Sequence, residues 1–290
     1  MDDYMKDIVG VITKKNFVSD DMIKTVLTVI GGKDPRRLGQ AGCDFTVLKP
    51  PNEHDLLKVR KLKVDINFVE KSNREKQIVV ADMDGTLIKE ESLDELSKLL
   101  DLRKEVGDLT NRAMQGDMPF RVSIQKRMKL LEGVRKEHLE ECFRHHINLR
   151  EGAEAFIKTM NARNALTILV SGGIKYFVSR VARRLKFSSF VSNEVMCKNG
   201  ILTGELEEPI VDDSTKFDVI KNISYRCGVG FENILAVGDG ANDIRMLESV
   251  GLGVAFRGKK IVKAATNIHI DHSDLTALLF LQGITEKFFK

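Results

Sequence analysis

Short apolar runs alternate with longer amphipathic segments over the last three quarters of this chain. The runs are almost wholly aliphatic, which is typical of strands buried on both faces of a parallel sheet. They occupy residues 78–81, 166–170, 234–237, 252–255 and 267–270. Most of the intervals between them repeat apolar residues every three or four positions, as helices do. The pattern therefore predicts an α/β fold with a Rossmann-like parallel sheet in residues 75–290.

One long interval carries no strand pattern. Residues 89–150 read as successive helices that start near positions 93, 102, 120 and 136, interrupted around Gly116 and Pro119. This helical block follows directly on the first core strand. We therefore expect a helical-bundle cap that covers the carboxyl end of that strand.

Residues 1–74 form a separate pattern. Strand-like runs at 7–13, 43–48 and 64–69 alternate with helical segments at 19–30 and 52–61, which predicts a small α/β domain of βαβαβ order. We find no catalytic group of residues in it and interpret it as a regulatory or dimerising module. A polar joint at 71–76 separates it from the second domain, 75–290.

Composition narrows the function classes. The chain of 290 residues has 46 basic and 42 acidic side chains, a balance that gives no support for a nucleic-acid or membrane partner. The four cysteines are scattered without metal-ligand spacing, and no signal peptide or membrane-spanning run is evident. We therefore expect a cytoplasmic protein that acts on a small molecule.

Acidic residues follow two of the core strands. Asp82 and Asp84 end the first strand, and Asp239 and Asp243 follow the strand at 234–237. A single Asp there would be read as a helix cap, but paired carboxylates after a buried strand are costly unless a cation or a reaction uses them. Because the set contains oxygen ligands alone, it indicates a hard cation such as Mg²⁺.

Anion-binding groups accompany these carboxylates. Ser171, Gly172 and Gly173 end the strand at 166–170 and offer a hydroxyl and free N–H groups, although Ser-Gly alone is a common turn. Lys216 lies near the start of a predicted helix. Together with the carboxylates and the metal, these groups indicate phosphoryl transfer through an aspartyl-phosphate.

The four stretches DMDGT, SGG, Lys216 and GDGANDIRM resemble the four motifs of the haloacid-dehalogenase superfamily of phosphatases. Their position between strands and helices, in this order, is highly specific and covers 75–290. The cap is similar to that of the phosphoserine phosphatase subgroup, and residues 1–74 resemble more loosely the extra domain of its bacterial members. Gly85 departs from the Ser that many of these members have.

The resemblance implies roles for residues of the core. Asp82 would be the nucleophile and Asp84 the proton-transfer group. The metal ligands would be Asp82, Asp84 and Asp239, with Asp243 behind them. Groups that bind the phosphoryl oxygens or the substrate would be Ser171, Gly172, Gly173, Lys216 and Asn242.

The resemblance also implies the substrate. Glu91 would bind its ammonium group, Arg127 its carboxylate, and Phe120 would cover it. The implied reaction is Mg²⁺-dependent hydrolysis of O-phospho-L-serine, the final step of serine biosynthesis, in an enzyme that could dimerise through its N-terminal domain.

Two other interpretations stay open at this point. A related cap-bearing phosphatase could act on another small phosphorylated metabolite, although Glu91 and Arg127 together suit an amino-acid end. A non-catalytic regulator with an amino-acid-binding N-terminal module is a second alternative. The presence of Asp82, Asp84, Lys216 and Asp239 argues against it.

Overall fold

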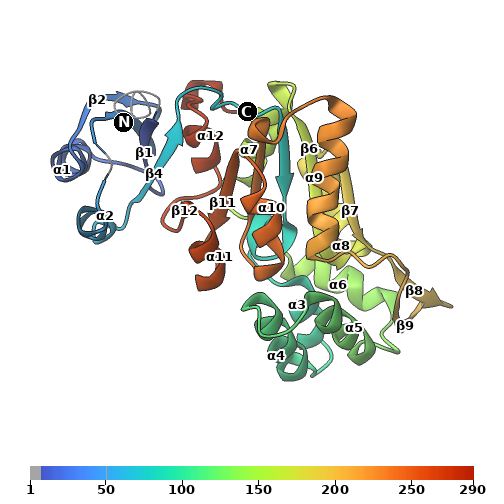
Figure 1. Cartoon of the computed structure of the whole chain (residues 1–290). Helices are drawn as coiled ribbons and strands as arrows, with labels where there is room; N and C mark the ends of the chain where they lie inside the picture. Colours follow the sequence, from blue (N-terminus) through green and yellow to red (C-terminus); the bar gives the residue numbers. More distant parts are fainter. Residues whose placement is uncertain (1–7, 50) are drawn as a thin grey trace.

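The main sheet of the protein has six parallel strands. A computed structural model describes residues 8–49 and 51–290 (Figure 1). The strand order is β12-β11-β10-β5-β6-β7. The strands are β5 (Ile78–Ala81), β6 (Leu166–Ile174), β7 (Ser189–Asn193), β10 (Ile234–Gly238), β11 (Leu252–Phe256) and β12 (Ile268–Ile270). The expected α/β fold with a parallel sheet is confirmed.

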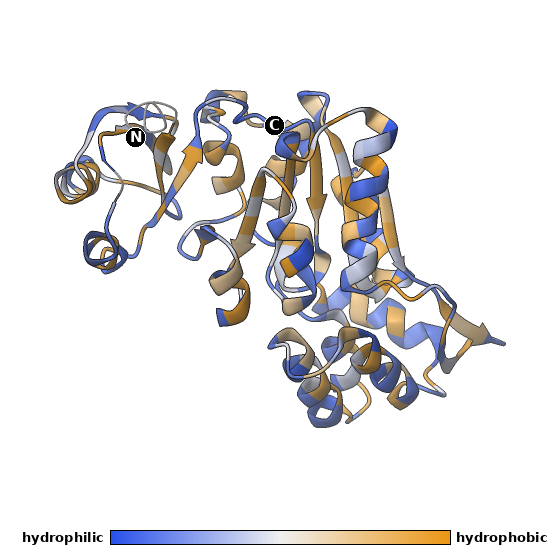
Figure 2. Ribbon diagram, in the orientation of Figure 1, coloured by the Kyte–Doolittle hydropathy of each residue, from blue (hydrophilic) through white to orange (hydrophobic). Residues whose placement is uncertain are grey.

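Helices cover both faces of this sheet. Val79 and Leu235 face a cluster built with α7 (Ala153–Ala162), α8 (Lys175–Leu185) and α12 (Ala277–Leu281). Val80 and Ala236 face the opposite cluster, built with α9 (Asp213–Cys227), α10 (Ile244–Glu248) and α11 (Lys260–Ala265). Figure 2 shows the strands as predominantly hydrophobic and α9 with a polar outer side. This two-sided burial explains the continuous apolar runs.

The cap consists of α3 (Ser92–Lys98), α4 (Arg103–Met114), α5 (Phe120–Leu130) and α6 (Lys136–His146). It lies below the carboxyl ends of the strands in Figure 1. Two antiparallel segments, joined by the bridge between Ile88 and Leu149, form the hinge that connects it to the core.

A β-hairpin of the core contacts the cap. It comprises β8 (Val195–Lys198) and β9 (Ile201–Leu206), joined by Asn199 and Gly200, both with positive φ. The backbone N–H of Leu202 donates to the Val134 carbonyl, and the Gly133 N–H donates to the Leu202 carbonyl. The hairpin is therefore hydrogen-bonded to the cap although it belongs to the core in sequence.

The N-terminal residues form a second, antiparallel sheet of order β2-β3-β1-β4. Its elements are β1 (Ile8–Thr13), α1 (Asp20–Ile30), β2 (Gly32–Arg37), β3 (Gly42–Val47), α2 (Glu53–Arg60) and β4 (Asp65–Glu70). Ser19 caps α1 by accepting the Met22 N–H, and Gly31 ends the helix in the left-handed conformation. One face of the sheet carries α1 and α2, and the other packs against α12.

Side chains of β4 fasten this sheet to the outer strand of the main sheet. The Asn67 amide donates to the backbone carbonyl of His269 and accepts its N–H, both at 2.8 Å. The Asp65 carboxylate accepts the N–H groups of Asp271 and His272. The two sheets are thus joined by buried side chains rather than by strand pairing.

Three strands differ from the sequence-based expectation. The strand β2 was not predicted, because its sequence GKDPRR is polar, contains Pro and is almost wholly exposed. The strand β7 was not predicted either. The strand β6 continues through Gly173 to Ile174 instead of ending before Ser171, with an irregular register against β7 at that point.

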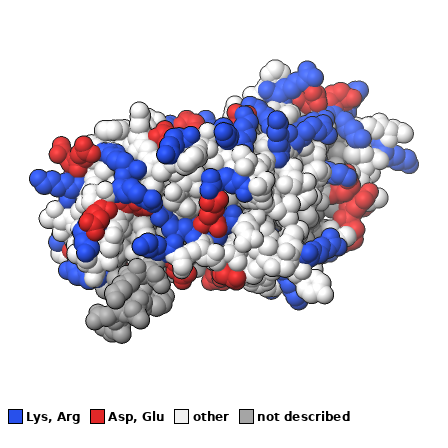
Figure 3. All heavy atoms as spheres, turned by 90° about the horizontal axis from the view of Figure 1, so that it is seen from above, with Lys and Arg blue, Asp and Glu red and all other residues white. Residues whose placement is uncertain are grey.

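The surface remote from the cap carries basic and acidic side chains close together (Figure 3). Among the residues that the structure describes, no helix is both long and apolar enough to cross a membrane.

Candidate active site

The turn after β5 brings two carboxylates to the edge of the sheet. Asp82 follows the strand directly, and the turn Met83–Leu87 carries Asp84. Gly85 has φ +68°, and a Cβ atom there would lie 2.6 Å from Oδ2 of Asp239. The Thr86 hydroxyl donates to Oδ1 of Asp239 at 3.2 Å. Glycine therefore lets the two strand ends approach closely.

A buried lysine holds the carboxylates together. Nζ of Lys216 lies 2.6 Å from Oδ1 of Asp82 and 2.6 Å from Oδ1 of Asp243, and its side chain is fully buried. The other oxygen of Asp243 accepts the N–H groups of Asp239 and Gly240. Both carboxylate oxygens of Asp243 thus accept hydrogen bonds from the protein, whereas Asp82 and Asp239 each have one oxygen that could bind a ligand.

The donor set fits a divalent cation. Carboxylate oxygens of Asp82, Asp239 and Asp243 lie within 4.8 Å of one another. Burial, followed by the neighbouring acids, raises the pKa of Asp82 well above its usual range and that of Asp239 to about 7, despite the opposing effect of Lys216. A group of buried carboxylates that offers only oxygen ligands matches the preference of Mg²⁺.

The carboxylate of Asp84 lies apart from this group. Its Oδ1 accepts the Ser92 N–H at 2.7 Å, and its Oδ2 lies 3.4 Å from the Ser171 hydroxyl. The Ser171 Oγ also accepts the Gly173 N–H at 2.9 Å. A Cβ atom at Gly173 would lie 2.9 Å from Oδ2 of Asp84. The Asp84 carboxylate therefore faces the Ser171 turn.

The cap closes over these groups. One cavity is lined by Asp82, Asp84, Glu91, Ser92, Leu93, Met114, Phe120, Ile124, Arg127, Ser171, Gly172, Gly173 and Asn242. The Phe120 ring lies so close to Gly172 that a Cβ atom there would be 2.2 Å from it. The cavity volume is about 20 Å³, roughly that of one water site. A ligand larger than a water molecule can therefore enter only if the cap or its side chains move.

Two charged side chains of the cap face this cavity without an ion pair in the described part of the chain. Arg127 is 3% exposed, donates from Nη1 to the Thr110 hydroxyl at 3.2 Å and has no hydrogen-bond partner at Nε. Its guanidinium lies 5.7 Å from the centre of the Phe120 ring. Burial raises the pKa of Glu91 well above its usual range, helped by Asp84.

The structure brings the sequence-predicted residues into one site. Lys216, Asp239 and Asp243 lie beneath the cavity, and the other nine line it. Asn242, which lines the cavity, has an Oδ1 atom without a hydrogen-bond partner among the residues described.

Sequence reasoning missed two further contributors. The Ser92 hydroxyl is buried in the cavity wall without a partner, and Thr110 links Arg127 to Asp94. Ser92 adjoins Glu91 in the chain, a signal that could have been used. The Thr110 contact depends on how α3 packs on α4 and has no sequence signal.

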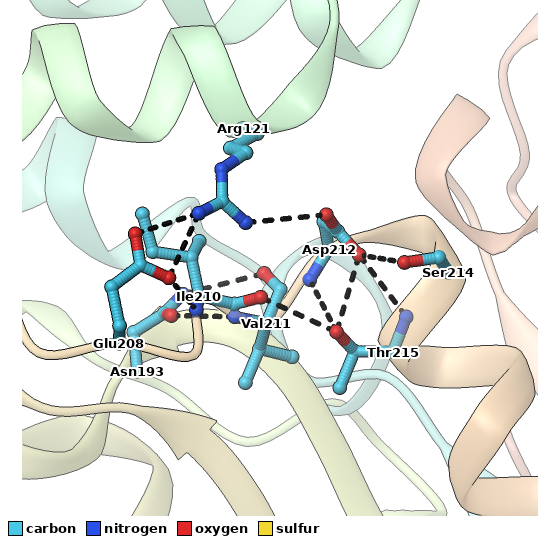
Figure 4. Close-up of polar contacts among 8 residues, drawn as sticks. All are labelled: Arg121, Asn193, Glu208, Ile210, Val211, Asp212, Ser214 and Thr215. Atoms are coloured by element: carbon cyan, nitrogen blue, oxygen red, sulfur yellow. Dashed lines mark hydrogen bonds and ion pairs between the residues drawn. The ribbon is translucent and has the colours of Figure 1, made fainter.

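A polar network joins the cap to the core beside the cavity (Figure 4). The Arg121 guanidinium, next to Phe120 on α5, donates to the Glu208 carboxylate at 2.6 Å and lies 3.9 Å from Asp212. Asp212 is the N-cap of α9, the helix that carries Lys216. The network therefore connects the cap to the helix that positions the buried lysine.

Residues 79–248 match the model of the haloacid dehalogenase-like hydrolase family, over more than half of the chain. The chain belongs to this family. Curated relatives include a phosphoserine phosphatase of Lactococcus lactis, 36% identical over 73% of this chain and 98% of its own length. A phosphoserine phosphatase of Archaeoglobus fulgidus is 37% identical over 75% of this chain, and the alignment spans 63% of that protein.

Solved structures give the same family. A HAD-family hydrolase from Salmonella enterica serovar Typhi superposes with a TM-score of 0.83 and 25% identity, covering 94% of this chain and 98% of that one. A phospho-aspartyl intermediate analogue of phosphoserine phosphatase gives 0.68 and 33% identity, covering 71% and 98%. The chain is thus a hydrolase of the haloacid dehalogenase-like family, and the likeness to the Salmonella protein extends over the N-terminal sheet.

Proposed function

We propose that this hydrolase cleaves O-phospho-L-serine to serine and inorganic phosphate. The observation that carries the proposal is the pair Glu91 and Arg127, which line the cavity that contains Asp82 and have no ion-pair partner among the described residues. Arg127 is buried and Glu91 is partly buried. A substrate with an ammonium and a carboxylate would supply both missing charges. The relatives named phosphoserine phosphatase support the same substrate.

The proposed chemistry assigns covalent catalysis to Asp82. Lys216 binds its Oδ1, which leaves Oδ2 to attack phosphorus and form an aspartyl-phosphate while the ester P–O bond breaks. Asp84 protonates the leaving serine oxygen and later removes a proton from the water that hydrolyses the intermediate. The Ser171 hydroxyl and the nearby backbone N–H groups bind the phosphoryl oxygens.

We propose Mg²⁺ as the cofactor, held by Asp82, Asp84 and Asp239 with Asp243 behind them. When bound, the ion supplies Lewis-acid stabilisation of phosphoryl charge. Asp84, whose carboxylate faces Ser92 and Ser171, enters as the proton-transfer group. In this proposal the reaction is the final step of serine biosynthesis. Residues 1–74 form a regulatory or dimerising module.

Phosphate release from a panel of small phosphomonoesters tests the proposal. Phosphoserine should give the highest kcat/KM, EDTA should abolish turnover, and added Mg²⁺ should restore it. A higher kcat/KM for a phosphate ester that lacks an amino-acid end would favour the alternative of another small metabolite. Full activity after chelation, with metal shown to be absent, would overturn the cofactor proposal.

A further inference from the structure

A second hollow lies where three parts of the molecule meet. It has a volume of about 270 Å³ and shares no lining residue with the active-site cavity. We call it the junction hollow and define it by Lys15, Lys89, Arg150, Glu151, Phe256, Arg257 and Asp274. Lys15 follows β1 of the N-terminal sheet, Lys89 and Arg150 belong to the cap hinge, and Arg257 follows β11 of the core.

Two guanidinium groups converge on one aromatic ring in this hollow. Those of Arg150 and Arg257 lie 5.6 and 5.7 Å from the centre of the buried Phe256 ring. Neither forms an ion pair with a carboxylate of the described residues within 4.0 Å. Arg257 also has a φ of +49°, a conformation that non-glycine residues rarely adopt. Two like charges that lie close together without a carboxylate beside them favour the binding of an anion between them.

The acidic residues of the junction hollow do not balance this charge. Four basic and two acidic side chains leave a net charge of +2. The Glu151 carboxylate already lies 2.7 Å from the Lys15 ammonium, and Asp274 accepts the Thr276 N–H at 2.8 Å. The cationic groups of Lys89, Arg150 and Arg257 are therefore the ones available to a ligand.

We propose that the junction hollow binds a small dianion with phosphate-type or carboxylate oxygens. Two charges neutralise the surplus, and guanidinium groups bind both kinds of oxygen in a bidentate manner. The Arg150 guanidinium donates from Nε and Nη2 to the Gly85 carbonyl, at 3.0 and 2.7 Å. A bound dianion would thus connect the cap hinge and the end of β11 to the turn that carries Asp84.

Thermal unfolding of the Mg²⁺-supplemented enzyme tests this site. Sulfate is the phosphate-type probe and malonate the dicarboxylate probe, each compared with chloride at equal ionic strength. A ligand that binds only the folded state raises Tm in a saturable way. At saturation we expect the rise to be larger in wild type than in Arg257→Gln by about 2 °C or more.

Matched variants separate this site from the active site and from general charge effects. Arg184→Gln removes an exposed, unpaired guanidinium from α8 and should respond as wild type does. Arg257→Gly removes the guanidinium at a position whose positive φ suits glycine, so its fold should be retained while the response is lost. The probe with the larger shift identifies the oxygen type. Equal responses in wild type and both Arg257 variants, or shifts no greater than with chloride, would overturn the proposal.

Discussion

At the scale of single residues, the main feature of the site is the buried guanidinium of Arg127, which pairs with no carboxylate of the described residues. Arg127 is 3% exposed, and its guanidinium makes one side-chain hydrogen bond in the described part of the chain, to Thr110, with Nε unpaired. Burial lowers its pKa, and the nearby acids Glu91 and Asp94 only partly oppose this. An uncompensated buried charge is unfavourable. An unpaired guanidinium at this position is what the proposed binding of a substrate carboxylate requires.

Replacement of Arg127 by Ala should separate substrate recognition from chemistry. Loss of one partner from a buried charged pair costs about 2–5 kcal/mol, which corresponds to roughly 30- to 5000-fold. We expect kcat/KM for phosphoserine to fall within that range. The value for p-nitrophenyl phosphate, which has no carboxylate, should change much less. Steady-state kinetics with both substrates measure the difference.

Arg112→Ala is the control, since this exposed arginine of α4 lies on the same cap. It should leave both substrates unaffected. If Arg127→Ala reduced the two substrates equally, the role of Arg127 would be structural.

Asp82→Asn should remove turnover and keep the fold. An amide cannot attack phosphorus, yet it is isosteric, and Lys216 retains its contact with Asp243 at 2.6 Å. We expect a circular dichroism spectrum like that of wild type and phosphate release at background level. Wild-type-like turnover in this variant would contradict covalent catalysis by Asp82.

At the scale of elements, helix α5 combines recognition with closure. Phe120 and Arg127 are seven residues apart, two helical turns, and therefore lie on one face toward the cavity. Arg121 lies on the adjoining face and contacts Glu208 and Asp212 of the core. The helix that lines the cavity with Phe120 and Arg127 thus also carries an ion pair to the core.

Arg121→Ala should weaken closure of the cap. Its side chain and that of Glu208 are 44% and 61% exposed, so the pair is worth at most about 1 kcal/mol. Because only the closed form holds substrate fully, KM for phosphoserine should rise by up to about 5-fold, with kcat little changed. Initial-rate kinetics at varied substrate concentration measure this rise.

A double-mutant cycle identifies the pair. Glu208→Gln should have a similar effect, and the double variant should be no worse than either single one. Arg135→Ala disrupts an exposed ion pair to Glu137 inside the cap and should leave KM unchanged. Additive effects of the Arg121 and Glu208 changes would show that the contact does not govern closure.

The sequence predicted those elements whose local pattern decides their structure. The apolar runs at 78–81 and 234–237 each specify a buried strand through their own residues, with few neighbours involved. The polar strand β2 forms because β3 pairs with it, and β6 continues through Gly173 because β7 lies beside it. The contact of Arg121 with Glu208 spans 87 residues of sequence, so no local pattern could reveal it.

At the scale of the whole molecule, a buried ion pair helps to tie the N-terminal sheet to the core. Oδ2 of Asp44, on β3, accepts from Arg74 Nη1 at 2.8 Å and from Arg36. The Arg74 side chain also donates to the carbonyls of Phe280 and Leu281, on α12. The Arg74 and Asp44 side chains are 9% and 6% exposed, so this ion pair is buried between the N-terminal sheet and the core.

Asp44→Asn should destabilise the protein in a pH-dependent way. Burial alone would raise the pKa of Asp44, but the hydrogen bonds and charges of Arg36 and Arg74 outweigh it and lower the pKa. A lowered pKa adds stability above the ordinary aspartate pKa, and this stability is lost as pH falls through the folded-state value. Removing one partner of a buried pair costs about 3–5 kcal/mol. Calorimetric Tm values should therefore differ most between variant and wild type near pH 7.

The difference in Tm should shrink as the pH falls below about 4, the range in which free aspartate becomes protonated. Asp20→Asn is the control, since that carboxylate is 93% exposed although it pairs with Arg37. A difference that stays constant from pH 7 to pH 3 would show that the Asp44 charge is not what holds the units together.

The fastening of β4 to β12 has a consequence for behaviour in a concentrated solution. A strand with one unpaired side is a template on which another chain can add a strand, the first step toward aggregation. Here the amide of Asn67 takes both backbone groups of His269, and Asp65 takes two further N–H groups. The N-terminal unit therefore blocks the β12 edge of the main sheet from pairing with a strand of another copy.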